Sequence, residues 1–264
     1  ILYVEIDYDE NVSNGVKIAE VIQKLPDTGE DGSPHIIRLS GEITKEALLK
    51  IAESLKDPTR QVVLDCSKCV MEARYVDWTA DTELHSAFAN CVSLREFYYP
   101  MNVTSSGGNT FKNCSFLRKV VFNNELKRVG GDDQVWSWEN NAMFAGARIK
   151  TIFIPKSVNK FGGYPFSYSN IVNIFIEEGS TILTPIGTAF GQWNTWVAVK
   201  EPLRFRVPQS IYDVVKNYNT TFQGYGADGD GVSTVSASCR ISDHIALWDG
   251  DYESIDYTAR YEVI

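Results

Sequence analysis

Two cysteines three residues apart are the first feature of this sequence that could do chemistry. Cys66 and Cys69 have the spacing of a zinc site or a redox pair, and His85 with Cys91 could complete four zinc ligands. We favour the alternative that Cys66 replaces an inward leucine of a strand, because free cysteine behaves as a small buried hydrophobic residue. A disulfide from Cys69 to Cys66 or to Cys91 stays open for a secreted protein. We predict no bound metal and no cofactor.

The sequence lacks the residue patterns of nucleophilic and phosphate-binding enzymes. Its three histidines, His35, His85 and His244, lie in three different segments, with no Gly-x-Ser-x-Gly elbow nearby. No glycine-rich phosphate loop leads from a strand into a helix. We therefore predict a protein that is not an enzyme and has no catalytic residues, with a hydrolase or redox enzyme kept as a third alternative.

Aspartates beside glycines offer the remaining ligand chemistry. Asp228 and Asp230, and later Asp249 and Asp251, could hold calcium through their carboxylate oxygens. The twelve-residue calcium loop with its distal glutamate is absent, and aspartate next to glycine is also common in turns. We favour turns at both places.

The charge balance excludes some classes of partner. Acidic residues outnumber basic ones by 34 to 25, which gives a net charge of -9. A negative surface repels phosphate, so we predict no nucleic-acid partner.

No apolar run reaches the roughly 18 residues that cross a bilayer, so we expect no transmembrane segment. Because the sequence begins at Ile1 without a signal peptide, we expect a signal or lipid anchor to have been removed.

The first part of the chain has the pattern of a small α/β unit. Pro26 ends an amphipathic helix, and Thr44 can cap a second one. Apolar spacing predicts strands over residues 2–8, 35–39 and 61–65. It predicts helices between them, over residues 12–25 and 44–55.

Phenylalanines anchor an internal repeat in the rest of the chain. Successive anchors are 23, 33, 22 and 24 residues apart, at Phe88, Phe111, Phe144, Phe166 and Phe190. Four anchors are followed by one apolar residue, a second three positions later and a third two positions after that, as at Leu94, Phe97 and Tyr99. An insertion of about ten residues over 130–141 explains the long interval. Such units bury a core only when they stack, with one short strand in each turn.

Two phrases recur in these copies. The copy from Phe111 to Phe122 reads Phe-x-x-Cys-x-x-Leu-x-x-Val-x-Phe, and Ile154-Pro-Lys-Ser-Val158 follows the strand of the next copy. Together they resemble the BspA-type leucine-rich repeat family of bacterial surface proteins, over about residues 61–216. Cys91 and Cys114 occupy the same position in their copies, whereas the third and fourth copies have lost this cysteine.

The resemblance implies an α+β, β-dominated fold built around a leucine-rich repeat solenoid. The solenoid is expected over 61–216, with an N-terminal α/β capping unit over 1–60. Residues 217–264 contain alternating stretches at 232–241 and 252–263. They are expected to form a β-rich C-terminal cap or the start of a further module, because the end of a solenoid must be covered.

The resemblance also implies a function. It indicates a non-enzymatic, adhesin-like binding protein, extracellular or at the cell surface, that recognises host or neighbouring-cell macromolecules. Its partner is expected to be a surface protein, and the chain itself is expected to be a monomer. The alternative is a glycan-binding module that uses exposed aromatic residues.

Strand alternation predicts which residues would bind a ligand. If the three apolar positions of each copy point inward, the residue between the last two points outward. This outward row and the charged positions beside it are Tyr98, Val121, Phe153, Phe175 and Arg206, with Glu96, Lys119 and Arg204. Trp136 and Trp138 in the insertion are added to the predicted site. The alternative is that the insertion or the tail covers the row, or that the row reflects only the strand propensity of its residues.

Overall fold

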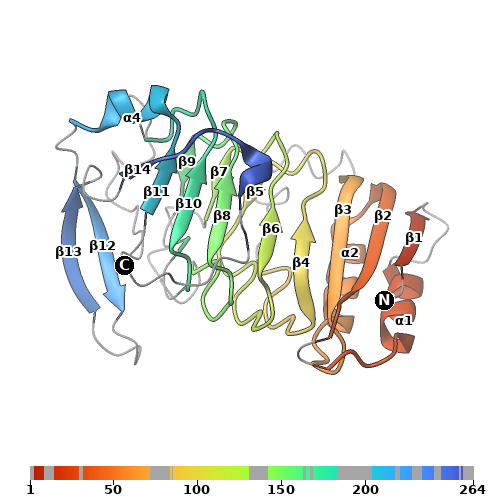
Figure 1. Ribbon diagram of the computed structural model, residues 1–264. Coiled ribbons are helices and arrows are strands. Elements are labelled where there is room, and N and C mark those ends of the chain that lie inside the picture. Colours follow the sequence, from red (N-terminus) through yellow and green to blue (C-terminus); the bar gives the residue numbers. More distant parts are fainter. Residues whose placement is uncertain are drawn as a thin grey trace.

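A computed structural model of the chain is rich in β-sheet and has few helices (Figure 1). The structure describes residues 3–8, 15–29, 32–71, 84, 86–130, 142–162, 165–166, 169–183, 204–217, 221–227, 234–240, 245–255 and 257. In this part of the chain, no helix is long and apolar enough to cross a membrane.

The N-terminal segment alternates parallel strands with helices, as its sequence pattern predicts. Its elements are β1 (Tyr3–Tyr8), α1 (Val16–Lys24), β2 (His35–Ile43), α2 (Lys45–Ser54) and β3 (Val62–Met71). The hydroxyl of Thr44 accepts a hydrogen bond from the amide of Ala47 at 3.0 Å, which caps α2 as expected. The strand predicted to end at Leu39 continues to Ile43, because β3 pairs with residues 40–43 beyond a bulge as well as with residues 35–38 before it.

Parallel strands then continue the sheet through the repeat region. One five-stranded sheet has the order β1-β2-β3-β4-β6, and a four-stranded sheet has the order β14-β11-β10-β8. The additional strands are β4 (Leu94–Tyr98), β6 (Lys119–Val121), β8 (Thr151–Ile154), β10 (Asn173–Ile176), β11 (Arg204–Val207) and β14 (Ile245–Leu247). The two sheets adjoin between β6 and β8 (Figure 1). Hydrogen bonding from β2 to β3 and on to β4 thus crosses the boundary predicted between residues 60 and 61.

A smaller, three-stranded sheet is formed by the segments that follow β4, β6 and β8. Its parallel strands have the order β5-β7-β9 and span Ser105–Ser106, Arg128–Val129 and Lys160–Phe161. Each follows a turn that begins after one of the longer strands, and each places a residue in the core, such as Val129 and Phe161. One copy therefore contributes two strands that face each other across the core.

Stacked phenylalanine rings fill the centre of the repeat region. Phe88 and Phe111 have ring centroids 5.9 Å apart, Phe111 and Phe144 5.7 Å, and Phe144 and Phe166 6.1 Å, all nearly parallel. All four rings are buried. The anchors are thus an inward ladder across four copies, as the repeat predicts, while Phe190 lies outside the described residues.

The turns after Phe88, Phe111 and Phe144 have a left-handed backbone. Asn90 and Asn113, each two positions after its phenylalanine, have φ of 63° and 61°, and Gly146 has φ of 74° at the same position. Asparagine and glycine are the residues that tolerate this conformation best. The amide of Asn90 donates to the carbonyl of Lys112, and that of Asn113 donates to Ala145, so these turns link successive copies.

The C-terminal segment adds a hairpin and a crossing tail. A helix, α4 (Gln209–Val215), follows β11 and leads to an antiparallel hairpin of β12 (Thr221–Ala227) and β13 (Thr234–Arg240). The chain then returns to the sheet, where β14 pairs with β11. The strand expected over 252–263 is wrong at its start, because Tyr252–Ser254 forms a 3-10 helix, η4, that the side chain of Asp251 caps.

Candidate functional site

The cysteines with metal-ligand spacing are buried thiols. Cys66, Cys69, Cys91 and Cys114 are all free and all buried. The thiols of Cys91 and Cys114 point to the carbonyls of Ala52 and Phe88, at 3.2 and 3.0 Å. Burial raises the pKa of Cys91 to about 12 and that of Cys114 well above its usual range. A thiol held in its neutral form is a poor metal ligand and a poor nucleophile.

A β-bulge explains why both cysteines of the Cys66-x-x-Cys69 pair face the core. Residues three apart in a regular strand point to opposite faces. The pairing of β3 with β2 shifts between Asp65 and Lys68, which adds one residue to β3. Asp65 fixes this bulge, because its Oδ1 accepts hydrogen bonds from the amide and the hydroxyl of Ser67, at 3.0 and 2.6 Å. No group of three or more histidine, cysteine or acidic side chains suited to a metal occurs within the described ranges.

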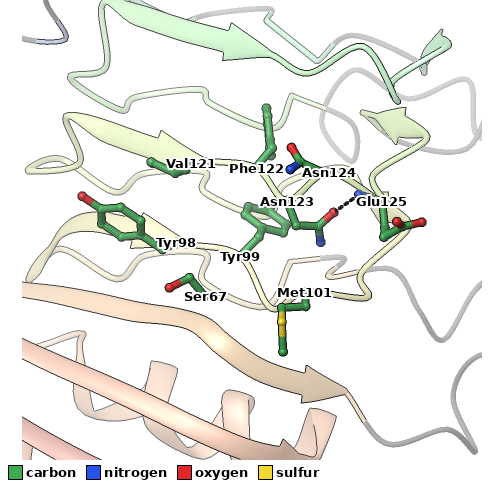
Figure 2. A pocket seen from close by; sticks show the side chains of 9 residues that line it. All are labelled: Ser67, Tyr98, Tyr99, Met101, Val121, Phe122, Asn123, Asn124 and Glu125. Atoms are coloured by element: carbon green, nitrogen blue, oxygen red, sulfur yellow. Dashed lines mark hydrogen bonds between the residues drawn. The ribbon is translucent and has the colours of Figure 1, made fainter. Parts of the chain in front are cut away.

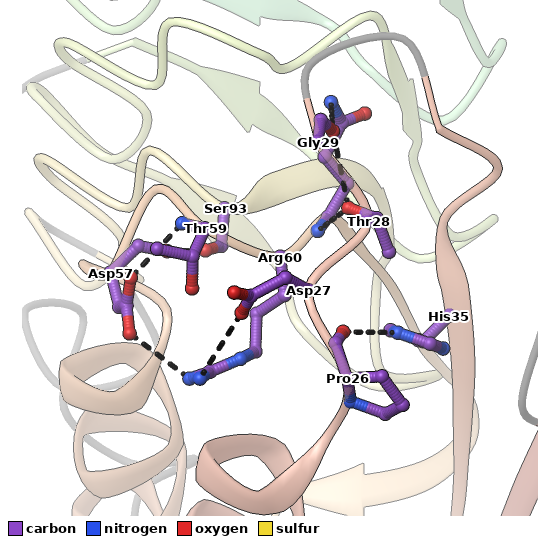
Figure 3. A network of polar contacts seen from close by, with 10 residues as sticks. Pro26, Asp27, Thr28, Gly29, His35, Asp57, Thr59, Arg60 and Ser93 are labelled. Atoms are coloured by element: carbon purple, nitrogen blue, oxygen red, sulfur yellow. Dashed lines mark hydrogen bonds and ion pairs between the residues drawn. The ribbon is translucent and has the colours of Figure 1, made fainter.

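His35 and the ion pairs of Arg60 belong to a network of polar contacts around the turns that follow α1 and α2 (Figure 3). His35 Nε2 lies 2.9 Å from the carbonyl of Pro26. Arg60 lies between Asp57, at 3.0 Å, and Asp27, at 3.8 Å. This network ties the turn after α1 to the turn after α2. His85 and His244 lie outside the described residues, as do Asp228 and Asp230.

The strand register aligns the predicted outward row. Tyr98 of β4 pairs with Val121 of β6. Phe153 of β8 pairs with Phe175 of β10, and Phe175 pairs with Arg206 of β11. All five side chains are half-buried, while the residues on either side of them in the strands point into the core. The row therefore runs across one face of the sheet in chain order.

The charged row beside it is also aligned. Glu96 pairs with Lys119, and Asn173 pairs with Arg204. Arg206 Nε donates to Asn173 Oδ1 at 3.0 Å, so this arginine lies along the sheet. Thr151, which has the same position in its copy, is fully buried. Trp136 and Trp138 of the insertion lie outside the described residues.

The C-terminal tail covers the middle of the outward row. We call residues 248–255 together with Tyr257 the strap. Trp248 packs edge-on against Phe175, with ring centroids 5.2 Å apart, and Tyr252 packs against Phe153 at 4.6 Å. Figure 1 shows this segment, in dark blue after β14, crossing the strands of the sheet. Coverage by the tail, which the sequence left open as an alternative, therefore applies to Phe153 and Phe175.

The strap also reaches the charged row. Lys119 Nζ lies 4.8 Å from the centroid of Tyr257 and 5.4 Å from that of Tyr98, so two rings flank one ammonium group. Burial, and then contact with Tyr252, raises the pKa of the Tyr257 phenol well above its usual range. Tyr257 is therefore a neutral ring under physiological conditions.

Beyond the strap, the row borders an open pocket of about 380 Å³ (Figure 2). Its lining combines two members of the row with the turns that follow β4 and β6. The lining residues are Ser67, Tyr98, Tyr99, Met101, Val121, Phe122, Asn123, Asn124 and Glu125. Met101 is the most exposed apolar residue among them, at 47%. The pocket thus has an apolar floor and an amide and carboxylate rim.

Hydrogen bonds fix the walls of this pocket. Asn123 Nδ2 donates to the carbonyls of Pro100 and Val103, and its Oδ1 accepts from the amide of Glu125 at 2.8 Å. On the opposite wall, the hydroxyl of Tyr98 donates to Glu96 at 2.9 Å. Burial and the charge of Glu96 raise the pKa of Tyr98 well above its usual range. These hydrogen bonds hold the side chains of both walls in place.

Sequence reasoning found part of this site. It placed Tyr98 and Val121 on the outward face, but it missed Met101, Asn124 and Glu125, which lie in the turns after the strands. The phrase Tyr99-Pro-Met-Asn-Val103 contained a usable signal, because it places a methionine directly after a proline, in the turn that follows the strand.

Stacked parallel strands with one buried phenylalanine per copy define a repeat protein. The family model of the BspA type leucine rich repeat region matches residues 82–171, in six copies, so this part of the chain is such a repeat region. The resemblance is thus confirmed over these residues. No curated protein and no solved structure was found to match the chain. Repeats of this family are generally non-enzymatic modules that bind proteins, and the proteins that carry them are typically found at the bacterial surface.

Proposed function

We propose that this chain is an adhesin-like binding protein whose repeats form a capped solenoid over about residues 61–216, with capping units at 1–60 and 217–264. It acts as a monomer outside the cell or at the cell surface, without enzymatic activity or a cofactor. Its partner is a protein on a host or neighbouring cell. The repeat match and the parallel, in-register sheet support this proposal.

The observation that carries the proposal is the pocket beside the uncovered end of the outward row. It joins Tyr98 and Val121, on the sheet face, to the exposed Met101 and to a polar rim. An apolar floor with a few fixed polar groups is the usual form of a recognition site. The pocket accepts one large apolar side chain of a partner, while Asn124 and Glu125 bind the neighbouring polar groups.

Surface plasmon resonance with purified extracellular-matrix and cell-surface proteins tests this function. Met101→Ser is expected to weaken binding about tenfold, because a central apolar contact contributes on the order of 1 kcal/mol or more. Leu49→Ser is the matched control, since Leu49 is similarly exposed, at 44%, on α2. If both variants bind as the unchanged chain does, the pocket is not the binding site.

A glycan-binding module is the second candidate, and the polar rim favours it. An aromatic ring beside amide and carboxylate groups also suits a sugar, whose C–H face packs on the ring. A glycan array separates the two functions. Binding that is lost in Asn124→Ala, with no response to any protein, would favour the glycan module.

A further inference from the structure

We propose that the outward face of β8 and β10 is a docking site for an aromatic peptide segment, and that the strap occupies it as a built-in competitor. The inference deepens the proposed function and rests on it, because it names the kind of segment that binds the covered half of the same face. Phe153 and Phe175 are the receptor rings, and Trp248 and Tyr252 are the rings that occupy them.

Aromatic contacts hold the strap on this face. Trp248 contacts both receptor rings, with centroids 5.2 Å from Phe175 and 6.1 Å from Phe153, and Tyr252 lies 4.6 Å from Phe153. All three pairs are edge-to-face, which is a favourable geometry for aromatic rings. Two aromatic residues four positions apart thus bridge two neighbouring strands.

The backbone of the strap is bonded mainly within itself. The amide of Trp248 still donates to the carbonyl of Val207, where β14 ends. Further along, the amides of Ser254 and Ile255 donate to Asp251 and Tyr252 inside the strap. A segment held on a sheet by side chains can leave without breaking a ladder of main-chain hydrogen bonds.

The fit of the strap is also incomplete. Among the described residues, the buried indole Nε1 of Trp248 has no hydrogen-bond partner, which is a free-energy cost to the docked state. Tyr252 remains 41% exposed although it contacts Phe153. A competing segment that places a ring without an N–H group at this position avoids this cost.

The outer end of the strap indicates where a bound segment would continue. Tyr257 packs near Lys119, which also faces Tyr98 at the edge of the pocket. A segment with aromatic residues at the spacing of Trp248, Tyr252 and Tyr257 would therefore run from β10 to the pocket. Such a segment would connect the covered half of the row to its open half.

A peptide with the sequence of residues 247–257, labelled with a fluorophore, tests the proposal on the full chain. Tyr252→Ser and the double variant Trp248→Ser, Tyr252→Ser weaken the built-in competitor without touching the receptor rings. Fluorescence anisotropy is expected to show binding to the double variant about tenfold tighter than to the unchanged chain, with Tyr252→Ser in between. Thermal melting by circular dichroism confirms that each variant is folded.

Adding Phe175→Ser to the folded single variant Tyr252→Ser provides the specificity control. Peptide binding should be lost with Phe175→Ser and retained with Leu49→Ser. Equal binding to the unchanged chain and to the released variants, binding that survives Phe175→Ser, or no binding to any variant would each overturn the proposal. These results are independent of the Met101→Ser experiment, because the peptide assay needs no external partner.

Discussion

Trp248 and Phe175 pack edge-to-face, with ring centroids 5.2 Å apart and planes at 83°, although 73 positions separate them in the chain. The contact places the C-terminal tail on the outward face of the sheet. It also divides the outward row into a covered part at Phe153 and Phe175 and an open part at Tyr98 and Val121. The open part borders the pocket, so the tail leaves this part of the row accessible.

A double-mutant cycle measures this contact directly. Replacing Trp248 and Phe175 by alanine, singly and together, should give a coupling energy of about 0.5–1.5 kcal/mol, the range for aromatic pairs. Urea unfolding supplies the three differences in the free energy of unfolding. Trp248→Ala combined with Leu49→Ala, on the helix at the other end of the molecule, should be additive. Additivity for the aromatic pair as well would mean that the strap does not rest on β10 in solution.

The phenylalanine ladder predicts a much larger effect from a core substitution. Phe111 is buried and stacks on Phe88 on one side and Phe144 on the other. Phe111→Ala should lower the free energy of unfolding by about 3–5 kcal/mol, because it removes buried surface and leaves a cavity. Phe111→Leu should cost clearly less. A loss for Phe111→Ala no larger than that for the half-buried Phe175→Ala would contradict the ladder.

Much of the fold follows from the spacing of a few residue types. The 22- to 33-residue recurrence of phenylalanine predicts the ladder, and strand alternation predicts that Tyr98, Val121, Phe153 and Phe175 face outward. Both are local periodic signals, which stacking amplifies because each copy repeats the same inward positions. The register of β4 with β6, and of β8 with β10, follows this pattern.

Two features had no such local signal. The bulge in β3 depends on hydrogen bonds between Asp65 and Ser67, so the Cys66-x-x-Cys69 spacing alone did not show that both thiols face the core. The alternation after Tyr252 indicated a strand, but the carboxylate of Asp251 caps a 3-10 turn and the ring of Tyr252 packs on Phe153. A tertiary contact has overridden the local pattern there.

The ion pair at the bulge predicts a dependence of stability on pH. Burial alone would raise the pKa of Asp65, but hydrogen bonds from Ser67 and Arg38 outweigh it and hold the pKa below its usual range. A carboxyl with a lowered pKa stabilises the fold above about pH 4, and this stabilisation is lost as pH falls through the folded-state pKa. Asp65→Asn should lower the free energy of unfolding by about 1 kcal/mol at neutral pH. It should also make the free energy of unfolding depend less on pH in the acid range. Arg38→Gln should weaken the same pH dependence. If stability falls with acid in both variants as it does in the unchanged chain, the Asp65–Arg38 ion pair does not cause this dependence.

The buried thiols predict low reactivity in the native state. At about pH 8.5, an ordinary cysteine is half ionised, whereas burial raises the pKa of Cys91 to about 12. Iodoacetamide should therefore leave Cys66, Cys69, Cys91 and Cys114 unmodified in native buffer and alkylate them in denaturant. Peptide mass spectrometry monitors each site separately. Modification of native Cys91 as fast as in the unfolded chain would show that this part of the core is open.

The left-handed turn at Asn113 makes a prediction about backbone conformation rather than packing. Its φ is 61°, and its side-chain amide donates to Asn90 Oδ1 at 3.0 Å on an exposed edge. Asn113→Ala should cost about 1–2 kcal/mol, because a β-carbon without a local polar group disfavours this conformation. Asn113→Gly should be close to neutral, since Gly146 holds the same position in the next copy with φ of 74°. Chemical denaturation of the two variants separates conformational strain from the lost hydrogen bond. If both cost the same, the hydrogen bond to Asn90, and not the backbone angle, is what the asparagine provides.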